Sequence, residues 1–176
     1  MRLKILACAA MLATAALASH AEDLTPTVPL IPNEAIPGSF SAGFGVTHEF
    51  AGSFSDTLTI SGALSGFVSA SLVTIGFLPQ ANINLTSVTL NGMPLVIVGG
   101  GMGVEVASLP LSAFSGPLTL VVTGMAAPSM LAGTAIAASY AGTVNVSAPV
   151  PEPESYALLL AGLGVVGLLS RRRFMG

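Results

Sequence analysis

The stretch from residue 22 to residue 150 contains no lysine, no arginine and no cysteine. The five basic residues of the chain all lie outside it, at Arg2, Lys4, Arg171, Arg172 and Arg173. The acids inside it are Glu22, Asp23, Glu34, Glu49, Asp56 and Glu105. Low charge combined with high apolar content is the opposite of what a disordered segment needs. We therefore expect one folded domain without a disulfide, and its negative charge argues against nucleic acid as a partner.

The residue pattern of this domain predicts a mainly β fold, an antiparallel β-sandwich-like body. Apolar and polar residues alternate in 88–90, 118–120 and 144–146, as they do in half-buried strands. Asn91-Gly92 between the apolar runs 87–90 and 95–98 predicts a hairpin, because both turn residues need positive φ. Further strands are expected at 42–50, 54–61, 64–77, 103–109, 117–123 and 134–147. The main role expected for six phenylalanines is to pack in the core: Phe40, Phe44, Phe50, Phe54, Phe67 and Phe77.

The N-terminus has the features of an export signal. Arg2 and Lys4 precede an apolar stretch over 5–17, and Ser19-His20-Ala21 supplies small residues at the −3 and −1 positions. We expect a signal peptide over 1–21, cleaved after Ala21. Residues 22–40 are rich in proline and should form an extended leader. The β-rich extracytoplasmic domain then covers 41–148.

The C-terminal segment, residues 149–176, has the order of a membrane-sorting tail. Pro151, Glu152 and Pro153 precede an apolar run, which ends at the basic block 171–173. A helix over 156–170 is expected, and counting its flanking serines it would be roughly 24 Å long. That is below the ~30 Å hydrocarbon core, so spanning needs bilayer thinning or snorkelling of Arg171, Arg172 and Arg173. The sequence therefore predicts a single transmembrane helix with a cytoplasmic basic stop.

These tail residues resemble the PEP-CTERM sorting signal of Gram-negative bacteria. The resemblance implies recognition and cleavage near the Pro-Glu-Pro motif by the membrane protease-transpeptidase exosortase. It also implies contact with the inner membrane during sorting, and then a location at the cell surface among exopolysaccharide. Within the body, Phe54-Ser55-Asp56-Thr57-Leu58 is similar to the FxDxF motif of one PEP-CTERM subgroup, with Leu58 in place of the second Phe.

Few residues of the body could perform chemistry, and no cofactor, metal or catalytic residue is predicted. Asp56 shares a strand face with Phe54 and Leu58. We expect an inward carboxylate that binds backbone N–H groups or protects an edge strand, with a calcium or sugar ligand as the alternative.

His48 and Glu49 point to opposite faces of a strand and are expected to be a surface polar pair. The glycines at 99–101 and 103 lack dinucleotide-binding spacing and predict a turn.

The leading hypothesis is a non-enzymatic, surface-sorted structural or adhesive protein of the exopolysaccharide or biofilm matrix. The first alternative is a carbohydrate- or calcium-binding surface module with Asp56 and Glu105 in its site. The second alternative is an extracellular hydrolase that uses two carboxylates, a mechanism that needs no histidine.

Overall fold

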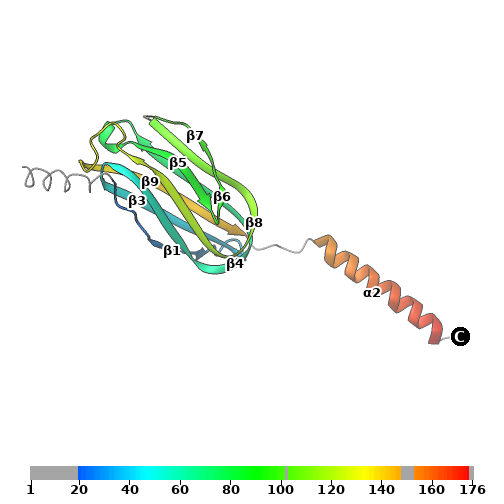
Figure 1. The fold of residues 1–176 in the computed structure, drawn as a ribbon. Coiled ribbons are helices and arrows are strands. Elements are labelled where there is room, and N and C mark those ends of the chain that lie inside the picture. Colours follow the sequence, from blue (N-terminus) through cyan, green and yellow to red (C-terminus); the bar gives the residue numbers. More distant parts are fainter. Residues whose placement is uncertain (1–19, 102, 148–152, 175–176) are drawn as a thin grey trace, which may run out of the picture.

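A computed structural model describes residues 20–101, 103–147 and 153–174. The strands are β1 (Thr27–Pro29), β2 (Ile31–Pro32), β3 (Ser39–Phe50), β4 (Gly52–Gly76), β5 (Ile83–Leu90), β6 (Met93–Pro94), β7 (Val96–Val98), β8 (Gly103–Ala126) and β9 (Ala135–Ser147). The 3-10 helix η1 (Pro79–Ala81) precedes β5, and helix α2 (Pro153–Phe174) follows β9. The prediction of a mainly β body is confirmed, because these segments form a nine-stranded sheet (Figure 1).

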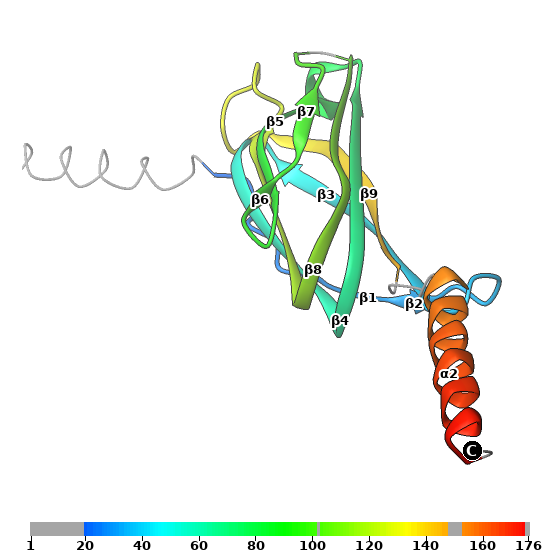
Figure 2. The same ribbon diagram turned by 90° about the vertical axis from the view of Figure 1, so that its right-hand side faces the viewer.

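Two long strands, β4 and β8, organise this sheet. They form one antiparallel ladder that runs from Gly52 opposite Ala126 to Gly76 opposite Gly103, and both extend along the length of the body (Figure 2). The ladder changes register between Ile60 and Leu64, where Gly62 has a φ of 122°. The predicted strands 54–61 and 64–77 are therefore one bent strand, and so are 103–109 and 117–123. Glycine permits the bend without ending the pairing.

The bend gives each half of the long strands different neighbours. The first half of β4 and the second half of β8 pair with β1 and β5, respectively. The second half of β4 pairs with β9, which continues to β3, while the first half of β8 pairs with β7. Buried side chains from both sets form one hydrophobic cluster, which includes Leu58, Ile60, Leu72, Val122 and Val144. The strand pairs described are antiparallel except β1 with β4, which is parallel.

The predicted turn at Asn91-Gly92 is present, but the hairpin it closes is short. Asn91 and Gly92 have φ angles of 47° and 80°, and Leu90 pairs with Met93. Pairing of β5 with β6 ends after Pro94, whose nitrogen carries no hydrogen to donate to a ladder. Leu95 still donates its N–H to the Val88 carbonyl of β5 at 2.8 Å, but the rest of the expected partner strand, Val96–Val98, joins β8, with Val96 opposite Ser108.

The aromatic residues divide between the core and the surface. Phe54 is buried, and Phe40 and Phe44 pack against the core from partly buried positions. Phe50, Phe67 and Phe77 are exposed, so their predicted place in the core was wrong. In strands, alternate residues face opposite sides, and Phe67 falls on the outward side. Phe50 shares the inward alternation of His48, but the pairing of β3 with β9 changes register between these two residues, and Phe50 is the last residue of β3. Phe77 lies in the segment after β4.

The proline-rich leader is part of the sheet. Its residues are extended, as expected for 22–40, but β1 pairs with β4 and β2 pairs with β3. Residues 1–19, which hold most of the predicted signal peptide, lie outside the described residues.

The prediction of a transmembrane helix at 156–170 is not supported. In the part of the chain that the structure describes, no helix combines the length and apolar character needed to cross a membrane. The physical reason is the short apolar run between Tyr156 and Leu169, which reaches only roughly 20 Å as a helix. The helix itself begins earlier and ends later than expected, from Pro153 to Phe174. Proline is favourable at the first helical position, because no hydrogen bond from its nitrogen is required there.

Candidate functional site: a buried polar centre under the N-terminal strap

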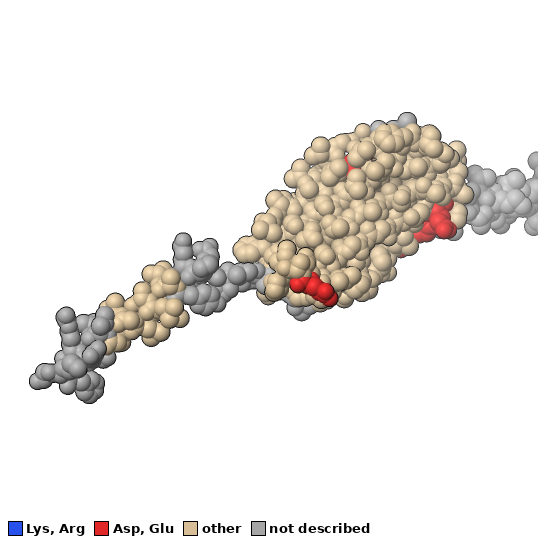
Figure 3. Space-filling view, turned by 180° about the vertical axis from the view of Figure 1, so that it is seen from behind, with Lys and Arg blue, Asp and Glu red and all other residues tan. Residues whose placement is uncertain are grey.

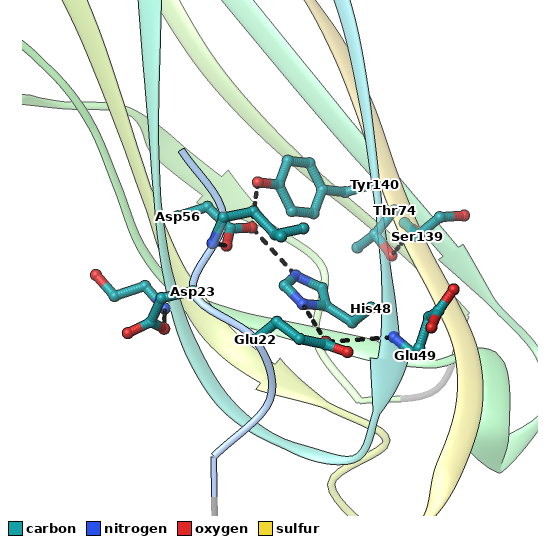
Figure 4. A network of polar contacts seen from close by, with 10 residues as sticks. Glu22, Asp23, His48, Glu49, Asp56, Thr74, Ser139 and Tyr140 are labelled. Carbon is teal, nitrogen blue, oxygen red and sulfur yellow. Dashed lines mark hydrogen bonds and ion pairs between the residues drawn. The ribbon is translucent and has the colours of Figure 1, made fainter. Parts of the chain in front are cut away.

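Three strands bring His48, Asp56 and Tyr140 together inside the body (Figure 4). His48 lies on β3, Asp56 on β4 and Tyr140 on β9. Their exposed fractions are 0%, 0% and 1%. Polar groups at this depth have lost their water, so each depends on partners within the protein. We call these three residues the polar centre.

Asp56 holds the polar centre together, because both of its carboxylate oxygens accept hydrogen bonds. The Tyr140 hydroxyl donates to Oδ2 at 2.6 Å. The backbone N–H of Leu24 donates to Oδ1 at 2.8 Å. Two such donors replace hydrogen bonds to water that the buried carboxylate has lost. Asp56 therefore connects β4 to β9 and to the segment before β1.

His48 lies between two carboxylates without a hydrogen bond to either. Its Nε2 is 3.1 Å from Asp56 Oδ2, and its Nδ1 is 3.9 Å from Glu22 Oε2. Neither ring nitrogen has an aligned hydrogen-bond partner in the described part of the chain. The two observations agree if the contact with Asp56 is close but poorly directed. His48 Nε2 and Asp56 Oδ2 are therefore in close contact without a formed hydrogen bond.

Aromatic rings enclose the imidazole and fix its plane. The Phe54 ring stacks on His48 with a centroid separation of 4.1 Å. Phe54 also lies nearly parallel to Tyr140 at 6.1 Å, and Phe44 meets Tyr140 edge to face at 6.5 Å. Offset and edge-on pairs of this kind add to the stabilisation from burial. These rings close the polar centre on the side of the core.

The Tyr140 hydroxyl is held in its protonated form. Burial raises the pKa of Tyr140 far above its usual value, and the hydrogen bond to Asp56 and the negative charge of that carboxylate raise it further. A phenolate beside a buried carboxylate would carry unfavourable charge repulsion. Tyr140 therefore remains a hydrogen-bond donor throughout the physiological pH range.

An extended segment that we call the strap, residues 20–26, covers the polar centre from the solvent side. Its Asp23 Oδ1 accepts the Ser55 N–H at 2.7 Å, and its Leu24 carbonyl accepts the Thr57 N–H at 2.9 Å. Glu22 reaches across to β3, where Oε2 accepts the Glu49 N–H at 3.4 Å. The strap therefore connects β4 to β3 directly above His48.

The comparison with protein families identifies the C-terminal segment. Residues 149–173 match the PEP-CTERM protein-sorting motif. The chain carries a PEP-CTERM sorting domain. No curated protein and no solved structure matches the chain. The motif implies export, membrane-associated sorting to the cell surface and processing by exosortase.

Only part of the PEP-CTERM motif lies in the described residues. Pro153 is the first residue of α2, and Arg171, Arg172 and Arg173 belong to its last turn. Pro151 and Glu152 lie outside the described residues. The predicted cleavage point of the other signal, Ala21, belongs to the strap and is 4% exposed.

The structure separates the two polar residues that the sequence placed side by side on β3. Glu49 is exposed, but the expected surface position of His48 was wrong, because His48 is completely buried. Asp56 points inward together with Phe54 and Leu58 and binds a backbone N–H, which favours a structural carboxylate over a calcium ligand. Membership of the FxDxF subgroup remains a prediction.

Glu105 is a second buried carboxylate, but it does not join Asp56. It is 3% exposed, and its Oε2 accepts the Leu85 N–H at 2.7 Å where β5 has a bulge. In the β4–β8 ladder Glu105 is opposite Thr74, whereas Asp56 is opposite Val122. Within the described residues, no group of three or more His, Cys, Asp or Glu residues is placed to hold a metal ion.

Sequence reasoning missed Tyr140, Glu22 and the buried state of His48. The alternation along β3 did indicate that His48 is buried. His48 lies an even number of residues from the buried Ala42 and Val46, so the three side chains share one face of the strand. Tyr140 likewise has the parity of Val144 and Val146 on β9. Nothing local indicates that Glu22 lies over His48, because that contact depends on the path of the strap.

Proposed function

We propose that this chain is a non-enzymatic structural or adhesive component of the exopolysaccharide or biofilm matrix of a Gram-negative bacterium. It is exported, sorted by exosortase, and presented at the surface as a sandwich-like β body. The observation that carries this proposal is the sorting motif at 149–173, which assigns the chain to surface sorting. The adhesive role is an inference from what the body offers.

The body offers little accessible chemistry, which supports a structural role. Its histidine at position 48, its most highly connected carboxylate, Asp56, and the Tyr140 hydroxyl are all closed off from solvent. Residues 22–150 supply no lysine, arginine or cysteine as an alternative base, cation or nucleophile. Figure 3 shows a face of the body with no basic side chain and only small acidic patches. General acid–base catalysis needs a titratable group that a substrate can reach.

The matrix role can be tested in the native host. We compare cohesion of the surface layer in cells with the intact gene, with the gene deleted, and with a chain that lacks residues 149–176. Deletion and tail removal should weaken cohesion equally, because a structural component must be retained where it acts. Full recovery of cohesion with the tail-less chain would contradict the proposal, since an exported enzyme would act without being sorted.

Catalysis is tested separately on surface protein purified from the host. Glycan, ester and peptide substrates should show no turnover above background. Turnover abolished by both Asp56→Asn and Glu105→Gln would favour the two-carboxylate hydrolase instead.

A second candidate function, binding of a neutral glycan, is favoured by a shallow hollow on the body. The hollow has a volume of about 360 Å³ and is lined by Ser71, Leu72, Val73, Val106, Ala141, Gly142 and Thr143. The Ser71 and Thr143 hydroxyls are 3.3 Å apart and exposed, beside the apolar Val73 and Val106. Apolar surface next to hydroxyls suits a sugar ring, and the absence of basic residues in 22–150 disfavours an acidic one.

Glycan binding predicts a specific effect of one substitution. Val106→Asp should abolish retention on neutral glycan columns. Val96→Asp is the matched control, because Val96 is exposed on the neighbouring strand, lies opposite Ser108 rather than Val106, and does not line the hollow. Equal retention of the two variants would exclude the hollow as the binding site.

A further inference from the structure

The predicted signal-cleavage bond, Ala21–Glu22, lies inside the strap rather than ahead of the folded body. Ala21 is 4% exposed and belongs to the hydrophobic core cluster. Its N–H donates to the Ser53 carbonyl at 2.9 Å. The preceding residue, His20, forms a parallel bridge with Ser53, and its Nδ1 is 2.7 Å from the Ser53 hydroxyl. The residues before the bond are therefore bound to β4.

The residues after the bond are bound as well. Asp23 accepts the Ser55 N–H, and the Leu24 N–H donates to the buried carboxylate of Asp56. Glu22 itself accepts the Glu49 N–H of β3. The bond is thus held from both sides by contacts to two strands.

A signal-processing protease must bind residues that the folded body already holds in its own contacts. It binds the chain in extended form and places the small −3 and −1 side chains, here Ser19 and Ala21, in its own pockets. Hydrolysis adds one water across the amide: the C–N bond breaks, Ala21 keeps the carboxylate, and Glu22 gains an α-ammonium. Ala21 can enter such a pocket only after it leaves the core and releases Ser53.

We propose that Ala21–Glu22 is a processing site that is open only before the strap docks, so that signal cleavage and folding of the body compete. Cleavage first gives a body whose strap begins at Glu22. Folding first gives a precursor whose signal is retained, because His20 and Ala21 are built into the edge beside β4. The inference rests on export of the chain by the N-terminal signal, which is part of the proposed function.

The test compares cleavage of the same bond in two contexts. The full-length precursor, folded in detergent, and a synthetic peptide of residues 8–30 are each incubated with purified signal peptidase. Mass spectrometry follows the appearance of the Glu22 N-terminus. Proteolysis that requires local opening proceeds in proportion to the open population, so the folded precursor should be cut at least about tenfold more slowly. Equal rates would overturn the proposal.

A strap variant sharpens the test. Asp23→Ala removes the acceptor of the Ser55 N–H and should speed cleavage of the folded precursor several-fold, while the peptide with the same change is cut at its original rate. Glu34→Ala is the matched control in the folded precursor, because Glu34 is an exposed acid outside the strap, and it should leave the cleavage rate of that precursor unchanged. Circular dichroism verifies that each precursor remains folded. If Asp23→Ala leaves the folded precursor as resistant as before, the strap contacts do not close the site.

The failure of this inference can be told apart from the failure of export itself. If the peptide is not cut after Ala21, the predicted signal-cleavage site is wrong, and the premise of export with cleavage at this bond is lost. If the peptide and the folded precursor are both cut after Ala21 at the same rate, the export signal stands. Only the proposal that folding protects the bond is then wrong.

Discussion

Asp56 and Glu105 are both buried carboxylates, but Asp56 contacts more segments of the chain than Glu105 does. Asp56 accepts hydrogen bonds from Leu24 and Tyr140 and touches His48, so it joins segments that are far apart in the sequence. For Glu105 the described contact is one backbone N–H, on the neighbouring strand β5. Burial of an acid therefore does not by itself define a site. What distinguishes Asp56 is the number of distant elements that depend on it.

The largest effect should come from removing the Asp56 carboxylate. Asp56→Ala leaves the Tyr140 hydroxyl and the Leu24 N–H unpaired in the interior and should lower the free energy of unfolding by about 3 kcal/mol. Urea denaturation of the purified chain measures this loss. Glu49→Ala is the matched control on the exposed face of β3 and should change stability little. Equal losses for the two variants would contradict the assigned role of Asp56.

Glu105→Ala should have a smaller effect, because it leaves a single backbone N–H without its partner. We expect a loss of about 2 kcal/mol in the same denaturation experiment. Glu105→Gln retains an acceptor oxygen and should recover most of that loss. A larger loss for Glu105→Ala than for Asp56→Ala would reverse the ranking on which the comparison rests.

Tyr140→Phe isolates one bond of the polar centre and should cost about 1 kcal/mol at neutral pH. It should also change the alkaline limb of the stability profile. The pKa of Tyr140 is raised on folding from its ordinary value of 10.0, so its contribution is fully present below that pH. Above it, the unfolded chain loses the proton while the folded chain keeps it, so stability falls with rising pH. The wild type should lose this increment above pH 10.0, and Tyr140→Phe should not.

The smallest effect is expected for Glu22→Gln. Glu22 has a side chain that is 35% exposed, and its Oε2 lies 3.9 Å from His48 Nδ1, so water and salt weaken the interaction. We expect at most about 0.5 kcal/mol, decreasing further as salt is added. A loss as large as that for Asp56→Ala would mean that Glu22, rather than Asp56, holds the strap.

The sequence predicted which residues form strands better than it predicted where the strands end and which strands pair. Alternating residues identified the strands, and the Asn91-Gly92 turn was correct because positive φ is a local requirement. The sequence predicts strand ends near Gly62 and Gly116, where the structure has bends, since glycine in a strand can mean either a turn or a continued, distorted ladder. The choice of β8 rather than β5 as the partner of β7 is set by tertiary packing, which no local pattern encodes.

The candidate site was predictable only in its parts. Asp56 was singled out because its neighbours Phe54 and Leu58 are apolar at the same parity. His48 was misplaced because its charged neighbour Glu49 suggested a surface pair, although parity with Val46 indicated the interior. The contacts with Tyr140 and with the strap join residues 84 and 32 positions from Asp56, so they depend on the completed fold.

The face without basic residues in Figure 3 has a consequence for how such a protein is observed. Residues 22–150 contain no lysine or arginine, so trypsin has no bond to cut there, even after unfolding. A body processed at both predicted ends would carry one primary amine, at its N-terminus, for amine-directed labels to find. Surface proteomics based on trypsin shaving or on biotinylated lysines would recover no peptide cut or labelled within residues 22–150, however abundant the protein is. Acid-specific or chymotryptic digestion would be needed to count it.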